Sequence, residues 1–142
     1  MRRTIAGKSL LTFLLGVFPL LNVLFDWNRT HVFNPTWPPH ARFHAAFGSV
    51  VAGGVVAIVI WLLWRPSTEP EVGVKVALLV QLALWTPFFY LTLIVPGTSL
   101  QVPEFVPPKI AGMVIDPQVV IAIIMLSLTA WGYRLATRPV AP

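Results

Sequence analysis

AAFGSVVAGGVVAIVIWLLW, residues 45–64, is a run of twenty residues without a charged side chain. A helix needs about 20 apolar residues to cross the roughly 30 Å hydrocarbon core of a bilayer. Three other stretches, 9–25, 76–95 and 117–133, are equally free of charge. The whole chain is 56% hydrophobic and only 11% charged, whereas a soluble domain carries about a quarter charged residues. The sequence therefore predicts four transmembrane helices.

These windows predict an all-α fold, an antiparallel four-helix transmembrane bundle that forms one membrane domain over residues 1–142. The expected helices cover about 9–25, 39–64, 76–95 and 117–133. Pro38-Pro39 favours a helix start because the pair imposes extended backbone before it and permits helix after it. Asp116-Pro117 reads as an N-cap followed by proline in the first turn. Two proline-rich extracytoplasmic loops, about 26–39 and 96–116, complete the expected architecture.

The basic residues predict the orientation of this bundle, because cytoplasmic loops carry an excess of lysine and arginine. Three basic residues flank one side, namely Arg29, Arg42 and Lys109. Seven flank the other: Arg2, Arg3, Lys8, Arg65, Lys75, Arg134 and Arg138. Both termini are therefore expected in the cytoplasm, with the chain in the plasma membrane (the inner membrane of a bacterium). The net charge of +5 is explained by this topology, and the absence of a basic stripe interleaved with aromatics argues against nucleic-acid binding.

Some function classes are disfavoured by missing residues. The chain contains no cysteine, which excludes disulfides, thiol chemistry and cysteine-ligated metals. None of the four apolar windows contains Asp, Glu, Lys or Arg, so a charge-coupled transporter with an intramembrane relay is not expected. Neither a glycine-rich phosphate loop nor a nucleophile elbow is present.

All three histidines lie in HVFNPTWPPHARFHA, residues 31–45. His40 and His44 are four residues apart and share one helical face, and His31 can return from the loop as a third ligand. Three imidazoles with an open position suit Zn²⁺ or Cu²⁺. Carboxylates that can support them or act as a base are Asp26, Glu104 and Asp116. Two alternatives remain open: His40 or His44 is a general acid or base, or all three histidines are interfacial side chains without a ligand.

Six polar or aromatic residues are placed by their depth near the same outer end, where they are candidates for ligand binding: Asn22, Asn34, Trp37, Arg42, Tyr90 and Gln118. Arg42 suits a phosphate or carboxylate headgroup, although simple snorkelling to the interface explains it as well. Asn34 is also expected to hold a turn. The small residues Gly48, Ala52, Gly53 and Gly54 predict close helix contact along the second helix.

The segment from Thr30 to His44 resembles an uncharacterised family of small four-helix integral membrane proteins from bacteria and fungi, some of which are labelled acetyltransferase. The positions that carry the resemblance are His31, Phe33, Asn34, Pro35, Trp37, Pro39, His40, Ala41, Arg42, Phe43 and His44. Such proteins often continue with an amide-rich turn, where this chain has Ala45, Ala46 and Phe47. The resemblance implies that the loop is a defined unit, and it implies no established activity.

Two functions follow as hypotheses. The first is an extracytoplasmic, histidine-lined pocket for a lipid-like or small apolar ligand, built around His31, His40 and His44, with a metal as a further option. The second is a non-catalytic helical subunit or scaffold that packs against other membrane subunits. In both hypotheses the lipid bilayer is the principal partner of the chain.

Overall fold

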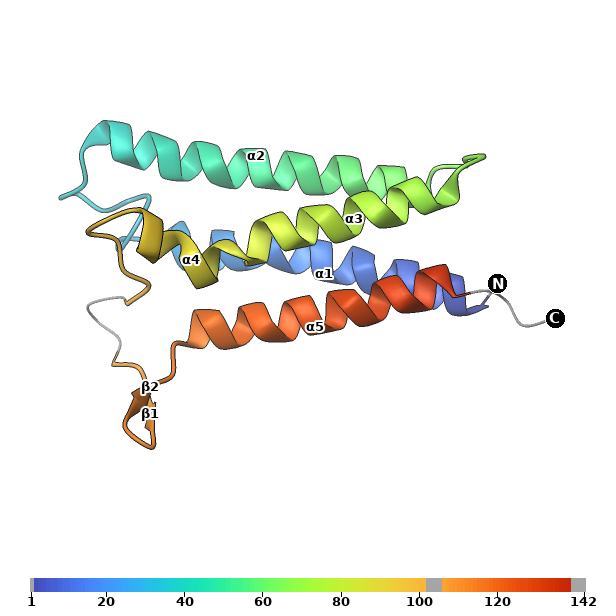
Figure 1. Cartoon of the computed structure of the whole chain (residues 1–142). Coiled ribbons are helices and arrows are strands. Elements are labelled where there is room, and N and C mark those ends of the chain that lie inside the picture. Colours follow the sequence, from blue (N-terminus) through green and yellow to red (C-terminus); the bar gives the residue numbers. More distant parts are fainter. Residues whose placement is uncertain (1, 102–105, 139–142) are drawn as a thin grey trace.

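The computed structural model describes residues 2–101 and 106–138. Its described residues form five helices: α1 (Arg2–Asp26), α2 (Pro39–Trp64), α3 (Pro70–Trp85), α4 (Pro87–Ile94) and α5 (Pro117–Thr137). Two short strands, β1 (Lys109–Ile110) and β2 (Met113–Val114), pair antiparallel before α5. The long helices lie side by side in one bundle, and the start of α1 and the end of α5 lie at the same end of it (Figure 1). The predicted all-α class is confirmed.

Three helices, α1, α2 and α5, are each long and apolar enough to cross a membrane. The fourth predicted span is a bent pair, because α3 and α4 meet at an angle of 45°. Pro87 causes this break, since proline donates no backbone hydrogen bond and its ring clashes with the preceding turn. The Thr86 hydroxyl donates to the Leu82 carbonyl (2.7 Å), which caps the end of α3. The chain is an integral, multi-pass membrane protein.

The observed bounds correct several of the predicted ones. The second helix has its predicted limits, whereas α1 starts earlier than residue 9 and α5 continues beyond residue 133. The third helix begins at Pro70 instead of residue 76 and is divided at Thr86. The β1–β2 hairpin was not predicted. Its turn places Ala111 and Gly112 at positive φ, of 51° and 81°, a combination typical of tight two-residue hairpin turns.

Gly7 and Gly73 lie at close contacts between helices, although the sequence did not single them out. A Cβ added to Gly7 of α1 would lie 2.4 Å from the Ala136 nitrogen of α5, and one added to Gly73 would lie 2.6 Å from the Leu62 oxygen. In contrast, Gly48, Gly53 and Gly54 have nothing within 4 Å of such a Cβ. These three glycines therefore do not make, within this chain, the close helix contact that their small size permits. Helix periodicity alone did not reveal which face of α2 meets α1 and α3.

The outward faces of the helices are apolar. Phe13 is 67% exposed, Val50 64% and Leu79 62%, although large apolar side chains in contact with water oppose folding. A hydrocarbon environment removes this penalty, because lipid tails are as apolar as these side chains. The predicted contact with the lipid bilayer follows from these surfaces.

Candidate functional site

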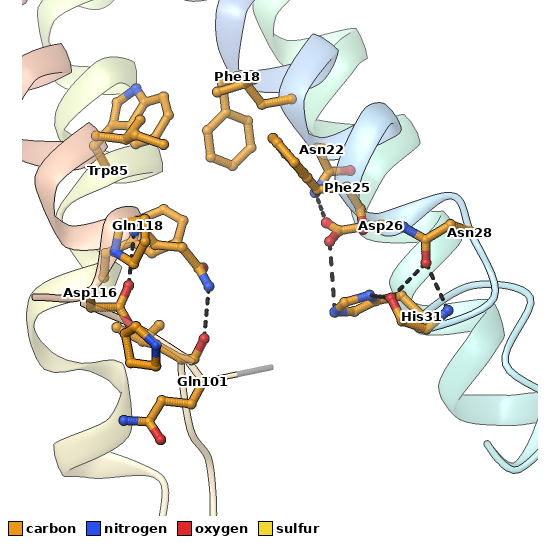
Figure 2. A pocket seen from close by; sticks show the side chains of 17 residues that line it. Phe18, Asn22, Phe25, Asp26, Asn28, His31, Trp85, Gln101, Asp116 and Gln118 are labelled. Carbon is orange, nitrogen blue, oxygen red and sulfur yellow. Dashed lines mark hydrogen bonds and ion pairs between the residues drawn. The ribbon is translucent and has the colours of Figure 1, made fainter. Parts of the chain in front are cut away.

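A cavity of about 450 Å³ lies beside the α3–α4 bend, between the second half of α1 and the first turns of α5. Leu100, Gln101 and Pro107, from the connection between α4 and β1, also line it. Its apolar lining comprises Phe18, Leu21, Phe25, Trp85, Phe88, Leu100, Pro107, Pro117 and Ile121. Its polar lining comprises Asn22, Asp26, Asn28, Thr30, His31, Gln101, Asp116 and Gln118. Figure 2 shows the labelled polar groups on two facing walls, with Phe18 and Trp85 beyond them.

The apolar wall is centred on Trp85, which is 3% exposed. Its ring meets Phe18 edge-on, with centroids 5.3 Å apart, and Phe88 at 5.7 Å. Trp85 Nε1 donates to Gln81 Oε1 (2.9 Å), so the indole N–H is satisfied inside the bundle. The side of the cavity at Trp85 is therefore lined by aromatic surface, which suits an apolar ligand group.

The polar wall is formed where α1 ends and the chain turns back. The Val32 amide donates to the Asp26 carbonyl (3.0 Å) and the Phe33 amide donates to that of Asn28 (2.9 Å). This tight turn brings His31 back over the end of α1. The His31 Nε2 lies 3.9 Å from Asp26 Oδ1, and Asn22 Nδ2 donates to Asp26 Oδ2. The three side chains form one connected polar group, visible in Figure 2.

The tautomer of His31 follows from its neighbours. The Thr30 hydroxyl donates to Asn28 Oδ1 (2.6 Å) and also contacts His31 Nδ1 (2.7 Å). Because that hydroxyl has only one hydrogen, Nδ1 is the donor in its contact with Thr30. Nε2 then faces Asp26 as a lone pair when the ring is neutral, and as an N–H when it is protonated. His31 can therefore accept or donate a hydrogen bond at the cavity.

The facing wall belongs to α5 and the segment that leads to it. Asp116 is the N-cap of α5, and its Oδ1 accepts from the backbone N–H of Gln118 (2.8 Å). The Gln118 side chain donates through Nε2 to the Leu100 carbonyl (2.8 Å), which ties that segment to α5. Because a proline follows the cap, the helix start is rigid. Asp116 and Gln118 thus hold this wall in place as well as lining it.

Of the predicted ligand-binding residues, Asn22 and Gln118 line the cavity, while Asn34, Trp37, Arg42 and Tyr90 do not. Asn34 holds a turn, because its Oδ1 accepts from the Thr36 amide (2.9 Å). Trp37 meets the His31 ring edge-on at 5.6 Å, outside the lining. Tyr90 is 43% exposed on α4. These positions do not converge with the cavity.

The three histidines are not brought together. His31 is held at the end of α1, whereas His40 and His44 lie on the exposed first turns of α2, with their Nε2 atoms 3.0 Å apart. Within residues 2–101 and 106–138, no group of three His, Cys, Asp or Glu side chains is placed to hold a metal. The described residues do not assemble the three-histidine arrangement, and a metal site made of all three histidines stays a prediction from the sequence. Three carboxylates were expected beside the histidines. Asp26 lies near His31, Asp116 is the N-cap of α5, and Glu104 lies outside the described residues.

Trp85 and Phe18 are among the cavity residues that sequence reasoning did not assign to the site. One signal for Trp85 was available: it lies within an apolar window, far from the interfaces where tryptophans gather, and directly before the Thr86-Pro87 break. Phe18 carries no comparable signal, because a phenylalanine in an apolar helix is ordinary.

Comparison with known proteins gives a family and no activity. No curated protein and no solved structure matches the chain. Residues 9–141 match a family of unknown function, DUF6640. This match covers nearly the whole chain, including every described residue of the cavity and of the α2 histidine pair. This multi-pass membrane protein is a member of the DUF6640 family of unknown function.

Proposed function

We propose that this protein binds one amphiphilic small molecule in the cavity beside the α3–α4 bend. The observation that carries the proposal is the division of the cavity lining, which is aromatic around Trp85 and polar around Asp26. A volume of about 450 Å³ falls within the range of about 300–1,000 Å³ that small-molecule pockets occupy. The apolar part of the ligand lies along Phe18 and Trp85, and its polar group meets α1.

The polar wall favours a ligand that donates hydrogen bonds. Asp26 lines the cavity, and its side chain is 34% exposed. An ionised carboxylate only accepts hydrogen bonds, so a ligand hydroxyl or amine can donate to it. Asn22 Nδ2 already donates to Asp26 Oδ2, which holds the carboxylate in place. An alcohol or amine headgroup on an apolar chain fits this wall.

The proposal concerns binding and assigns no reaction. His40 and His44, the catalytic candidates from sequence, are absent from the cavity lining. His31 is the histidine that reaches the cavity, where it contacts Asp26. The centre of the proposed site therefore moves from the start of α2 to the end of α1.

We also propose that the cavity opens toward the extracytoplasmic side. The start of α1, the end of α5 and the α2–α3 connection lie at one end of the bundle, and the cavity is at the other (Figure 1). The end with the termini has seven basic residues in its flanks and the cavity end has three. Positive flanks are retained in the cytoplasm, which supports this orientation.

A photoreactive monoacylglycerol with a diazirine in its acyl chain tests the binding site in lipid nanodiscs. Ile121 lines the cavity and Ile123, on the same helix, is 52% exposed. We expect Ile121→Trp to fill the cavity and to reduce saturable labelling at least tenfold, a loss of about 1.4 kcal/mol. The matched control Ile123→Trp should label like the wild type. Crosslinks mapped by mass spectrometry should include α1 near Phe18 and α4 near Phe88.

The headgroup preference is tested with the same probe. Unlabelled monoacylglycerol should compete better than the fatty-acid methyl ester of the same chain length, which has no hydrogen-bond donor. Asp26→Leu should remove much of that difference, because it removes the carboxylate acceptor from the cavity wall. Equal labelling of the two isoleucine variants would contradict the proposed site, whereas equal competition by the two lipids would contradict only the headgroup assignment.

A further inference from the structure

The exposed start of α2 carries a second group with a defined geometry, separate from the cavity. His40 and His44 lie one turn apart, with Nε2 atoms 3.0 Å apart, ring centroids 4.4 Å apart and ring planes at 89°. The helix start is fixed by Pro39 at its first position, and the Arg42 amide donates to the Pro38 carbonyl (3.2 Å). The proline start thus holds the two imidazoles in register.

The contact between the two rings depends on a single hydrogen. At 3.0 Å one Nε2 donates and the other accepts, because two N–H groups facing each other would repel. Two imidazole nitrogens therefore converge on the place where one proton lies. A metal ion with two free coordination positions can bind both Nε2 atoms once the proton of the donor ring moves through solvent to the Nδ1 of that ring, which keeps both imidazoles neutral.

We propose that His40 and His44 form a two-imidazole chelate for a divalent transition metal, with Cu²⁺ preferred. Metal–imidazole bonds of about 2.0–2.1 Å put neighbouring nitrogens about 2.9 Å apart at a square-planar centre and about 3.3 Å apart at a tetrahedral one. The observed 3.0 Å is within a few tenths of an ångström of both values, so the pair can close on an ion without a change in the helix. Square-planar nitrogen and oxygen sites select Cu²⁺ or Ni²⁺, and Cu²⁺ is bound most tightly among the divalent first-row metals.

The surroundings leave room for such an ion. Both histidines are exposed, and Arg42, two residues from each of them, points to the other side of the helix because two residues turn it by about 200°. Phe43 packs edge-on against the His44 ring at 5.7 Å. In the described part of the chain no third ligand joins the pair. The remaining coordination positions are therefore filled by water or by a ligand from outside the chain.

Titration of the nanodisc protein with Cu²⁺ alone, at about pH 7.5 and with an affinity tag free of histidine, tests the chelate. We expect one Cu²⁺ per chain, with an electron paramagnetic resonance spectrum that shows coupling to two imidazole nitrogens. Because the second imidazole binds intramolecularly, His40→Ala or His44→Ala should weaken binding about 10²-fold. His31→Ala should leave the affinity unchanged. Ni²⁺ and Zn²⁺ should compete less well than Cu²⁺.

A spacing control keeps the number of histidines constant. The double variant His44→Ala with Ala45→His retains three histidines but moves one to a different face of α2, so it should bind as weakly as His44→Ala. Thermal unfolding without metal checks that each variant is folded. Cu²⁺ should raise the Tm of the wild type and of His31→Ala, and leave the Tm of the other variants nearly unchanged. Wild-type affinity in the spacing variant, or a loss of affinity in His31→Ala, would overturn the proposal.

Discussion

Replacement of Gly7 with alanine is expected to destabilise the bundle by about 2–3 kcal/mol, a typical cost of overpacking. The added methyl group would lie 2.4 Å from the Ala136 nitrogen and 2.7 Å from the Gly132 oxygen. Both obstacles are backbone atoms, so no side-chain rotation relieves the clash and α1 must move away from α5. That helix pair is the most extensive in the bundle. The free energy of unfolding in mixed micelles measures the effect.

Gly16→Ala is the matched control, because it makes the same change in the same helix. Nothing lies within 4 Å of a Cβ at Gly16, so only the intrinsic helix preference of alanine acts there. That preference is worth up to about 1 kcal/mol in favour of the variant. The two substitutions should therefore change stability in opposite directions. Equal effects at both positions would show that α1 and α5 are not packed as closely as described.

The helices of this fold were predictable because their signals are local. Hydrophobic length depends only on composition within a window, and Pro38-Pro39 and Asp116-Pro117 mark the starts of α2 and α5 by backbone chemistry. The break before Pro87 was a visible signal too, although its 45° angle depends on packing against neighbouring helices. The start of α1 and the end of α5 were missed, because hydropathy marks the apolar part of a helix and not its polar ends.

The candidate site was less predictable, because its residues meet only through tertiary structure. The i, i+4 spacing was sufficient to place His40 beside His44. No periodicity fixes the direction of His31, which depends on a turn closed by backbone hydrogen bonds to Asp26 and Asn28. Asn22 and Gln118 were expected at the outer end from their depth alone, and both line the cavity. The aromatic wall required knowledge of which helix faces meet.

The glycines illustrate the same limit. Gly53 and Gly54 stand in a run of small residues that is typical of close helix pairs, yet nothing approaches them in this chain. Gly7 stands alone near a basic terminus and makes the closest approach. A sequence gives the size of a residue, whereas the face that meets a neighbour is decided by the packing of the whole bundle.

Cysteine labelling should give an all-or-none result on the orientation of the membrane protein. The natural chain has no cysteine, so a single introduced thiol is the only target for a membrane-impermeant maleimide. Val106 is 85% exposed at the cavity end, and Thr68 is exposed in the connection between α2 and α3 at the opposite end. We expect Val106→Cys to be labelled in intact cells and Thr68→Cys only after the membrane is made permeable.

The physical reason is the asymmetry of basic residues, seven against three, which retains the more basic flanks in the cytoplasm. The reverse labelling pattern would place the cavity and its polar wall on the cytoplasmic side. Amphiphile binding to purified protein would be unaffected by that outcome, because it depends on the lining of the cavity and not on its compartment. Labelling of both thiols in intact cells would instead indicate a mixed topology, and a charge difference of this size would then be too small to fix one orientation.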